Sequence, residues 1–274
     1  MSEFFSVMTL PLAACLILAG IHAYLGLHVI EREVIFVDLA LAQIAALGGG
    51  LALVFGFGMD SAHSYWMSLG FTVAGAAIFS FTRLKKQKIP QEAVIGIVYA
   101  VSAALLVMIM SRSGEGDEHI REALIGNILL VRSDAVIKIF WVYSAVGLFH
   151  FFCREKFLLI SQRPEEAFKR GMNVKLWDFF FYVSFGIVVT SSVKIAGVLL
   201  VFSFLVVPAV AAVLFSQTVR GRLVWGWGIG FLASILGMAV SYFLDFPTGA
   251  SVVCIFGLLL VILAAVKKIA GTTP

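Results

Sequence analysis

Charged residues are scarce in this chain of 274 residues: 13% are Asp, Glu, Lys or Arg, whereas 61% are hydrophobic. The mean hydropathy is +1.03. Because a soluble domain of this size does not need so much apolar surface, this balance excludes an ordinary soluble protein. Apolar runs of about 18 or more residues, enough to cross a hydrocarbon core of about 30 Å as a helix, recur along the whole chain. The composition therefore predicts an all-α, polytopic membrane protein.

The sequence also lacks the motifs of several common sites. Its three cysteines, Cys15, Cys153 and Cys254, form no CxxC pair, which argues against a disulfide framework or a thiolate zinc site. No GxxxxGK[ST] string occurs, so the chain cannot hold a nucleotide through a P-loop. Neither HExxH nor GxSxG occurs, and an intramembrane protease is therefore disfavoured.

The chain is interpreted as one transmembrane domain, residues 1–274, with about nine spans (eight to nine). No basic segment precedes the first apolar run and no small-residue cleavage site follows it, which favours a retained span. The net charge of +4 comes from Lys and Arg in short loops, so it does not indicate a nucleic-acid partner. The spans are expected at 7–27, 37–57, 64–84, 92–111, 135–153, 176–192, 195–215, 223–243 and 249–266.

Basic residues cluster in four places, at 83–88, 154–175, 220–222 and 267–268. Nine crossings put all four on the same side, which the positive-inside tendency makes cytoplasmic. The N-terminus is then expected outside the cytoplasmic membrane and the C-terminus inside.

The longest polar stretch, 153–180, carries the signals of one short cytoplasmic helix at about 161–172. These signals are a polar N-cap, a proline in the first turn, acids early, bases late and a final glycine. They are Ser161, Pro164, Glu165, Glu166, Lys169, Arg170 and Gly171. Such a helix either docks a partner or is a solvated connector.

Asp38 stands at the inner start of the second predicted span. A carboxylate carried to the bilayer centre costs about 2.5–3.5 kcal/mol, and less near the interface. Positions 38, 42, 45 and 49 share one helix face of small residues, which suits close packing or a pore wall. Asp38 is therefore either part of a cation pathway or an interfacial acid paired with Arg32 or with a helix N-terminus.

Four further side chains are candidates for contact with a cation. His22 lies in the first apolar run, either on the pathway or as a hydrogen-bonded core histidine. Glu92 either forms an inner gate or favours the positive N-terminus of its helix. Asp60 and His63, outside, have a spacing compatible with metal ligands, although loops also hold such pairs by chance. An outer group either attracts a cation or partner, or is a solvated loop: Asp117, Glu118, His119 and Glu122.

Four stretches match one known family in their order and spacing. They are HVIEREVIFVDLALAQIAALG, QEAVIGIVYAVSAAL, EALIGNILLV, and SQRPEEAFKRGMNV followed by AGVLLVFSFLVVPAVAA. The whole chain resembles the integral-membrane permease subunits of metal-ion ABC importers, the zinc, manganese and iron group with the cobalamin-importer (type II) transmembrane fold.

This resemblance implies a division of labour between subunits. Two copies of the permease would form the pathway as a homodimer, a separate ATPase dimer would power it, and an extracytoplasmic binding protein would deliver a divalent metal ion. The chain itself would be no enzyme, hold no permanent cofactor, and lie among lipids of the bacterial inner membrane. Residues 161–172 would be the coupling helix that docks into the ATPase, through Ser161, Pro164, Glu165, Glu166, Phe168 and Gly171.

An ion-gradient-driven secondary metal transporter is the alternative function. Such a carrier needs several mid-span carboxylates or broken-helix repeats. In this sequence only Asp38 and Glu92 are candidates for such carboxylates.

In the related metal permeases an Asp and a His four residues apart contact the ion at the position of Asp38. This sequence departs from that pattern, with Ala42 at i+4 and Gln43 at i+5. Gln43 lies about 140° from Asp38 on a regular helix, so we expect a π-bulge or unwound turn within 39–46 that returns it to the face of the acid. Amide and carboxylate oxygens suit harder ions than zinc, so these ligands do not settle the ion. Zinc or manganese is expected as the common cargo of the group, with ferrous iron as the further candidate.

Overall fold

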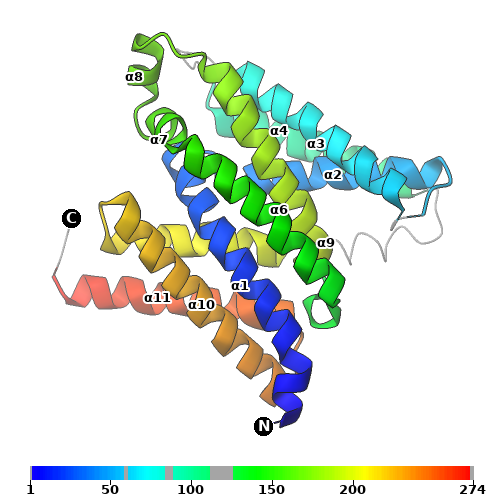
Figure 1. Ribbon diagram of the computed structural model, residues 1–274, viewed down its shortest axis with the longest axis vertical. Coiled ribbons are helices and arrows are strands. Elements are labelled where there is room, and N and C mark those ends of the chain that lie inside the picture. Colours follow the sequence, from blue (N-terminus) through cyan, green and yellow to red (C-terminus); the bar gives the residue numbers. More distant parts are fainter. Residues whose placement is uncertain (1, 59–60, 84–88, 112–125, 272–274) are drawn as a thin grey trace. The chain divides into compact units, whose positions relative to one another are not determined.

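The computed structural model describes residues 2–58, 61–83, 89–111 and 126–271, and every regular element in these ranges is helical (Figure 1). The elements are α1 (Ser2–Glu31), α2 (Val37–Val54), α3 (Ala62–Thr82), α4 (Gln91–Met110), the 3-10 helix η1 (Ile128–Leu130), α6 (Ser133–Phe152), α7 (Arg154–Gln162), α8 (Pro164–Lys169), α9 (Val174–Phe215), α10 (Val219–Leu244) and α11 (Thr248–Ile269).

Eight helices within these ranges are long and apolar enough to cross a membrane. One of them, α9, has 42 residues, about 63 Å of helix and twice the thickness of a hydrocarbon core. Gly197 interrupts α9 with a non-helical conformation, φ 74° and ψ 161°. The parts before and after this break correspond to the predicted spans 176–192 and 195–215. The prediction of an all-α protein with eight to nine spans is confirmed.

The chain divides into two compact units. The first consists of Met1–Ile30, Leu124–Ser144 and Lys194–Pro274, and the second of Glu31–Ala123 and Ala145–Val193. Within the first unit, α10 packs against α11, and the rings of Phe204 and Phe256 meet edge to face with their centroids 5.0 Å apart. The indole N–H of Trp227 donates to the carbonyl oxygen of Gly20 over 2.9 Å.

In the second unit, α2 packs against both α3 and α4, and the three helices lie side by side in Figure 1. The glycine run of α2 permits this close approach. A Cβ atom at Gly48 would lie 2.8 Å from the carbonyl oxygen of Met67, and one at Gly50 would lie 2.8 Å from Leu106 Cδ1. Such distances are shorter than side-chain packing allows, so the small face of α2 serves helix packing at these positions.

The cytoplasmic helix predicted at 161–172 is wrong in its start and its N-cap. Ser161 lies inside α7 and is buried, whereas α8 begins at Pro164 after Arg163, whose φ is −138° and ψ 63°. Proline disfavours a helical conformation in the residue before it and offers no N–H, so the chain breaks between the two helices. Upstream, residues 154–162 form a separate amphipathic helix that the sequence analysis did not anticipate.

The predicted end of this helix is confirmed at Gly171, which has φ 72°. The N–H of Gly171 donates to the carbonyl of Phe168 over 3.1 Å, and the N–H of Met172 donates to the carbonyl of Ala167 over 3.1 Å. These two bonds define a Schellman motif. Below it, the side chains of Ile160, Ala167 and Val174 form a small buried cluster that holds α7, α8 and the start of α9 together.

Candidate functional site

Asp38 lies in the first turn of α2 and is 2% exposed. Its carboxylate faces the backbone N–H groups of Asp38 and Leu39, where the positive end of the helix dipole favours a negative charge. Among the described residues, however, Asp38 Oδ1 has no hydrogen-bond partner. The helix N-terminus therefore stabilises the charge of Asp38 but leaves its Oδ1 atom without a hydrogen bond within the described ranges. A buried acceptor without a partner costs free energy, which makes Asp38 a candidate functional group.

Glu92 lies in the first turn of α4 and reaches the beginning of α2. Its Oε1 accepts a hydrogen bond from the backbone N–H of Phe36 over 3.0 Å. Its Oε2 is buried and has no hydrogen-bond partner in the described part of the chain. The carboxylates of Asp38 and Glu92 are close enough to repel each other. We call these two residues the carboxylate pair, since each presents a buried oxygen that a cation would satisfy.

The π-bulge predicted within 39–46 is absent, because α2 is an uninterrupted α-helix from Val37 to Val54. The contacts of α2 with α3 explain the regular helix. A Cβ at Gly75 would lie 2.5 Å from Ile44 Cδ1 and 3.3 Å from Leu41 Cδ2, and an extra residue would rotate these side chains off α3. Gln43 is therefore half-buried on another side of α2 from Asp38.

The other predicted ligands that the structure describes have contacts of their own. His22 belongs to the first unit, is buried, and contacts the carbonyl of Leu18 through Nδ1 over 2.8 Å. His63 is exposed and stacks on the ring of Phe57 with 4.5 Å between centroids. Asp60 lies outside the described residues. So does the predicted outer group of Asp117, Glu118, His119 and Glu122.

No group of three or more His, Cys, Asp or Glu side chains suited to a metal ion occurs within the described ranges. Asp38 and Glu92 are two predicted ligands that lie close enough to interact electrostatically. The pathway roles of His22, Gln43, Asp60 and His63 stay predictions.

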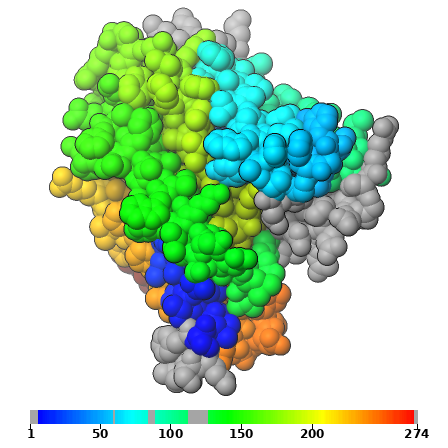
Figure 2. Space-filling model, turned by 45° about the vertical axis from the view of Figure 1, so that its right-hand side comes forward, coloured from blue at the N-terminus to red at the C-terminus, as the bar shows by residue number. Residues whose placement is uncertain are grey.

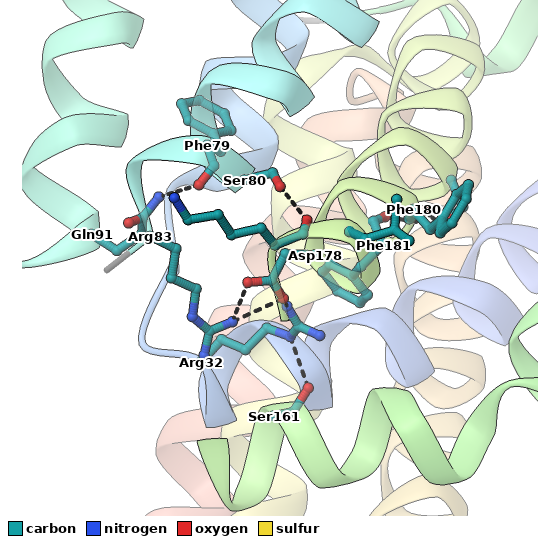
Figure 3. Close-up of polar contacts among 12 residues, drawn as sticks. Arg32, Phe79, Ser80, Arg83, Gln91, Ser161, Asp178, Phe180 and Phe181 are labelled. Atoms are coloured by element: carbon teal, nitrogen blue, oxygen red, sulfur yellow. Dashed lines mark hydrogen bonds and ion pairs between the residues drawn. The ribbon is translucent and has the colours of Figure 1, made fainter. Parts of the chain in front are cut away.

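A buried ion-pair network that the sequence analysis missed lies in the second unit. Asp178, near the start of α9, accepts from Arg32 Nη1 over 2.5 Å through Oδ1, and Arg83 Nη1 donates to both of its oxygens over 2.9 and 2.8 Å. Arg32 Nε also donates to Ser161 Oγ over 2.8 Å. Figure 3 shows both guanidinium groups pointing at the same carboxylate. We call Arg32, Arg83, Ser161 and Asp178 the Asp178 network.

The charged groups of this network are almost fully removed from solvent. The side chains of Arg32 and Asp178 are 0% exposed and that of Arg83 is 10% exposed. The guanidinium of Arg32 also lies 4.0 Å from the centre of the Phe181 ring, a stabilising cation–π contact. Removing one partner of such a buried pair destabilises a protein by about 3–5 kcal/mol, because it leaves an uncompensated charge.

The network also excludes one interpretation of Asp38. Arg32 was a candidate partner of Asp38, but its guanidinium is directed to Asp178 and Ser161 instead. One signal in the sequence pointed to Asp178: an acid at the head of a long apolar run needs a cation. The sequence could not name that cation, because Arg83 and Arg32 are 95 and 146 residues away along the chain.

The segment from α7 to α8 includes a short polar helix, α8, several of whose side chains are exposed. It lies in the green to yellow-green part of the chain in Figure 2. Glu166 pairs with Arg163 over 3.0 Å and with Arg170. Glu165 is exposed, and Phe168 is half-buried against the cluster beneath α8. Surface ion pairs of this kind contribute only about 0–1 kcal/mol, so the charge pattern of α8 is not explained by stability.

The fold and these sites define a multi-span helical membrane protein with a partly buried acidic pair and a surface helix between two spans. The family model described as the ABC 3 transport family matches residues 4–267. The chain belongs to that family, and its resemblance to permease subunits of metal ABC transporters is confirmed.

Two curated relatives illustrate the similarity. The manganese transport system membrane protein MntC of Listeria monocytogenes is 29% identical over 205 residues, 71% of each chain. The chelated iron transport system membrane protein YfeD of Yersinia pestis is 24% identical over 215 residues, 78% of this chain and 70% of that one. Among solved structures, PsaBC from Streptococcus pneumoniae in complex with Fab matches with a TM-score of 0.78 and 20% identity, covering 96% of this chain and 94% of that one.

Proposed function

We propose that the chain is the permease subunit of an ATP-driven importer of a divalent metal ion. Residues 1–274 act as one permease domain, and two copies form the pathway as a homodimer. A cytoplasmic ATPase dimer drives it, and an extracytoplasmic binding protein delivers the ion. The observation that carries this proposal is the carboxylate pair, in which buried Asp38 and half-exposed Glu92 each present a buried oxygen without a hydrogen-bond partner among the described residues. The chain is also a member of a transport family whose relatives are named for manganese and iron transport.

The donor atoms favour a hard cation. Asp38 and Glu92 supply carboxylate oxygens, and the position four residues after Asp38 is Ala42, where the resembling permeases have histidine. Oxygen ligands suit Mn²⁺, whereas imidazole and thiolate ligands favour Zn²⁺. The substrate is therefore proposed to be Mn²⁺, with Fe²⁺ kept as a candidate because of the relative named for iron transport and Zn²⁺ less favoured. No cofactor is proposed to be bound permanently, because the metal is the cargo.

The surface helix α8 supports the assignment of an ATPase partner. Its defined C-terminal end and its exposed charges suit docking into a cleft of another subunit, with Pro164, Glu165, Glu166, Phe168 and Gly171 near the contact. Ser161 is buried and bonded to Arg32, so it takes no part in docking. This side is proposed to be cytoplasmic in the bacterial inner membrane, with the N-terminus outside and the C-terminus inside. A gradient-driven carrier, the second candidate, has no use for such a helix.

The burial of Asp38 adds a requirement to the transport cycle. At 2% exposure, Asp38 does not line an open passage in this conformation, so an ion reaches it only when the surrounding elements move. An importer that alternates between closed and open states provides such a movement.

The test is reconstitution of the permease with its ATPase in vesicles, followed by ATP-dependent uptake of Mn²⁺, Fe²⁺ and Zn²⁺. The wild type is expected to take up Mn²⁺ or Fe²⁺ only when ATP is present, and Asp38→Ala is expected to abolish that uptake. Uptake driven by an ion gradient without ATP would support the secondary carrier instead. Unchanged uptake by Asp38→Ala would remove this acid from the mechanism.

A further inference from the structure

The Asp178 network joins elements that are far apart in the sequence. Arg32 follows α1, Arg83 follows α3, Ser161 lies in α7, and Asp178 lies in the first turns of α9. A further hydrogen bond joins α3 to the first turn of α9, since Ser80 Oγ donates to the carbonyl of Lys175. Figure 3 shows the guanidinium groups of Arg32 and Arg83 at the Asp178 carboxylate, with Ser161 bound to Arg32. One end of the second unit is thus organised around Asp178.

We propose that Asp178 and Arg32 are positioning residues that transmit movement of the α7–α8 segment to the carboxylate pair during transport. This inference rests on the proposed function, in which α8 docks on an ATPase. The shared carboxylate of Asp178 holds Arg32 in one state of the cycle and releases it in another, while Arg83 remains bound to it.

Arg32 links the α7–α8 segment to the backbone that precedes the carboxylate pair. At one end, its Nε atom donates to Ser161 in α7, and α7 shares a buried cluster with α8 through Ile160 and Ala167. At the other end, Arg32 lies four residues before Phe36, whose N–H is bound by Glu92. A displacement of α7 is therefore passed by a hydrogen bond and a short backbone segment to the carboxylate pair.

The backbone between Arg32 and Phe36 is held in a strained conformation. Glu33 has φ 55° although it is not glycine, and a residue with a Cβ atom adopts this left-handed region at a cost. Strained backbone persists where surrounding contacts hold it, and here the contacts of Arg32 and Phe36 flank it on both sides. Release of Arg32 would let this segment relax, and Asp38 follows it directly at the start of α2.

The second arginine makes such a release feasible. A buried carboxylate that loses its only cation is left uncompensated, but Asp178 has Arg83 bound through both oxygens. Arg32 in turn has the face of Phe181 beside it. Because Asp178 has two arginine partners, its ion pair with Arg32 can open while its ion pair with Arg83 stays formed. The network therefore has two discrete arrangements, as a two-state element requires.

The experiment measures ATP hydrolysis and Mn²⁺ uptake on the same vesicles containing the permease–ATPase complex, and reports Mn²⁺ transported per ATP. Asp178→Asn keeps the side-chain size and removes the charge, and Arg32→Gln removes the charge of the partner and shortens its side chain. Both variants are expected to hydrolyse ATP while the transport ratio falls about tenfold, a typical size for a lost coupling. A role in folding alone would lower hydrolysis and transport together and leave the ratio unchanged, which would overturn the proposal.

Ser161→Ala is the milder variant, because it removes one hydrogen bond and leaves every charge paired. It is expected to lower the ratio about fivefold, and it decides the question if Asp178→Asn does not fold. Thr190→Val is the matched control: Thr190 is buried in the same unit and bonded to Thr72 over 3.1 Å, outside the network, so its ratio should equal that of the wild type. A wild-type ratio for Ser161→Ala would overturn the proposal. No Mn²⁺ uptake by the wild type would instead count against the proposed function.

Discussion

The backbone N–H of Phe36 donates to Glu92 Oε1 over 3.0 Å, so the residue that precedes α2 is bound by the first turn of α4. This bond lies beside the buried carboxylate of Asp38. A side chain that carries a charge and also binds the backbone has two separable effects. Glu92 combines a structural contact with a negative charge that a cation would seek.

Substitutions at Glu92 separate these two effects. Glu92→Gln retains an oxygen that can accept from Phe36 and removes the charge, whereas Glu92→Ala removes both. Glu92→Gln is expected to raise the KM for Mn²⁺ uptake about tenfold with a smaller change in maximal rate, because it weakens binding of the ion. Glu92→Ala is expected to reduce both. If Glu92→Gln transports like the wild type, Glu92 serves only to hold the start of α2.

The helix geometry of α2 makes a prediction about ion selectivity. Because α2 is regular, residue 42 lies on the side of Asp38 and residue 43 does not. Ala42→His is therefore expected to shift competition for uptake toward Zn²⁺ by about tenfold, since an imidazole nitrogen suits that ion. Gln43→His is the matched control and should leave the preference unchanged. A shift in Gln43→His alone would mean that α2 changes its geometry during transport.

Ala42 is buried, so a larger side chain there costs about 1–3 kcal/mol of packing. Thermal unfolding of the purified variant therefore accompanies the uptake measurement. A folded Ala42→His protein with the wild-type preference would contradict the proposed position of the ion.

The left-handed conformation of Gly171 predicts a cost for any side chain at this position. Gly171→Ala is expected to lose about 1–2 kcal/mol, since a Cβ atom disfavours positive φ. The Schellman bonds that end α8 would weaken, and less ATPase should copurify with the permease. Gly70→Ala is the control, because Gly70 lies inside α3 and a Cβ atom added there would have no neighbouring atom within 4 Å. Equal melting temperatures for the two variants would contradict the assignment.

Phe168 is half-buried where α8 packs on the cluster formed with Ile160 and Val174. Phe168→Ala is expected to reduce copurification of the ATPase, because α8 loses its apolar support, while Phe168→Leu should keep most of it. The amounts of both subunits after affinity purification provide the measurement. Undiminished copurification with Phe168→Ala would mean that the ATPase docks elsewhere.

The sequence was sufficient for the spans, because long apolar runs bounded by polar loops have few alternatives in a membrane. It also located the end of α8 through Gly171, where a local backbone requirement selects the residue. It failed at Ser161, which looked like an N-cap but bonds to Arg32, 129 residues away in sequence. Such pairings depend on tertiary contacts that no local pattern encodes.

The carboxylate pair illustrates the same limit within one site. Asp38 was identified as a costly acid at a span end, and Glu92 as an inner gate or an acid at its helix N-terminus. Nothing in the sequence predicted that Glu92 would bind the backbone at Phe36. Gln43 was placed wrongly because the expected bulge would have disturbed the packing of α2 on α3. Local chemistry selected the candidates, and packing between helices decided their positions.

The central claim is that a divalent cation binds at Asp38 on its way through the permease. Electron paramagnetic resonance of Mn²⁺ added to the purified permease–ATPase complex tests this binding without requiring transport. The wild-type complex is predicted to bind Mn²⁺ at a saturable site, and Asp38→Asn, which keeps the side-chain size, is predicted to lose that site while remaining assembled. Saturable Mn²⁺ binding of equal affinity in Asp38→Asn would contradict the account.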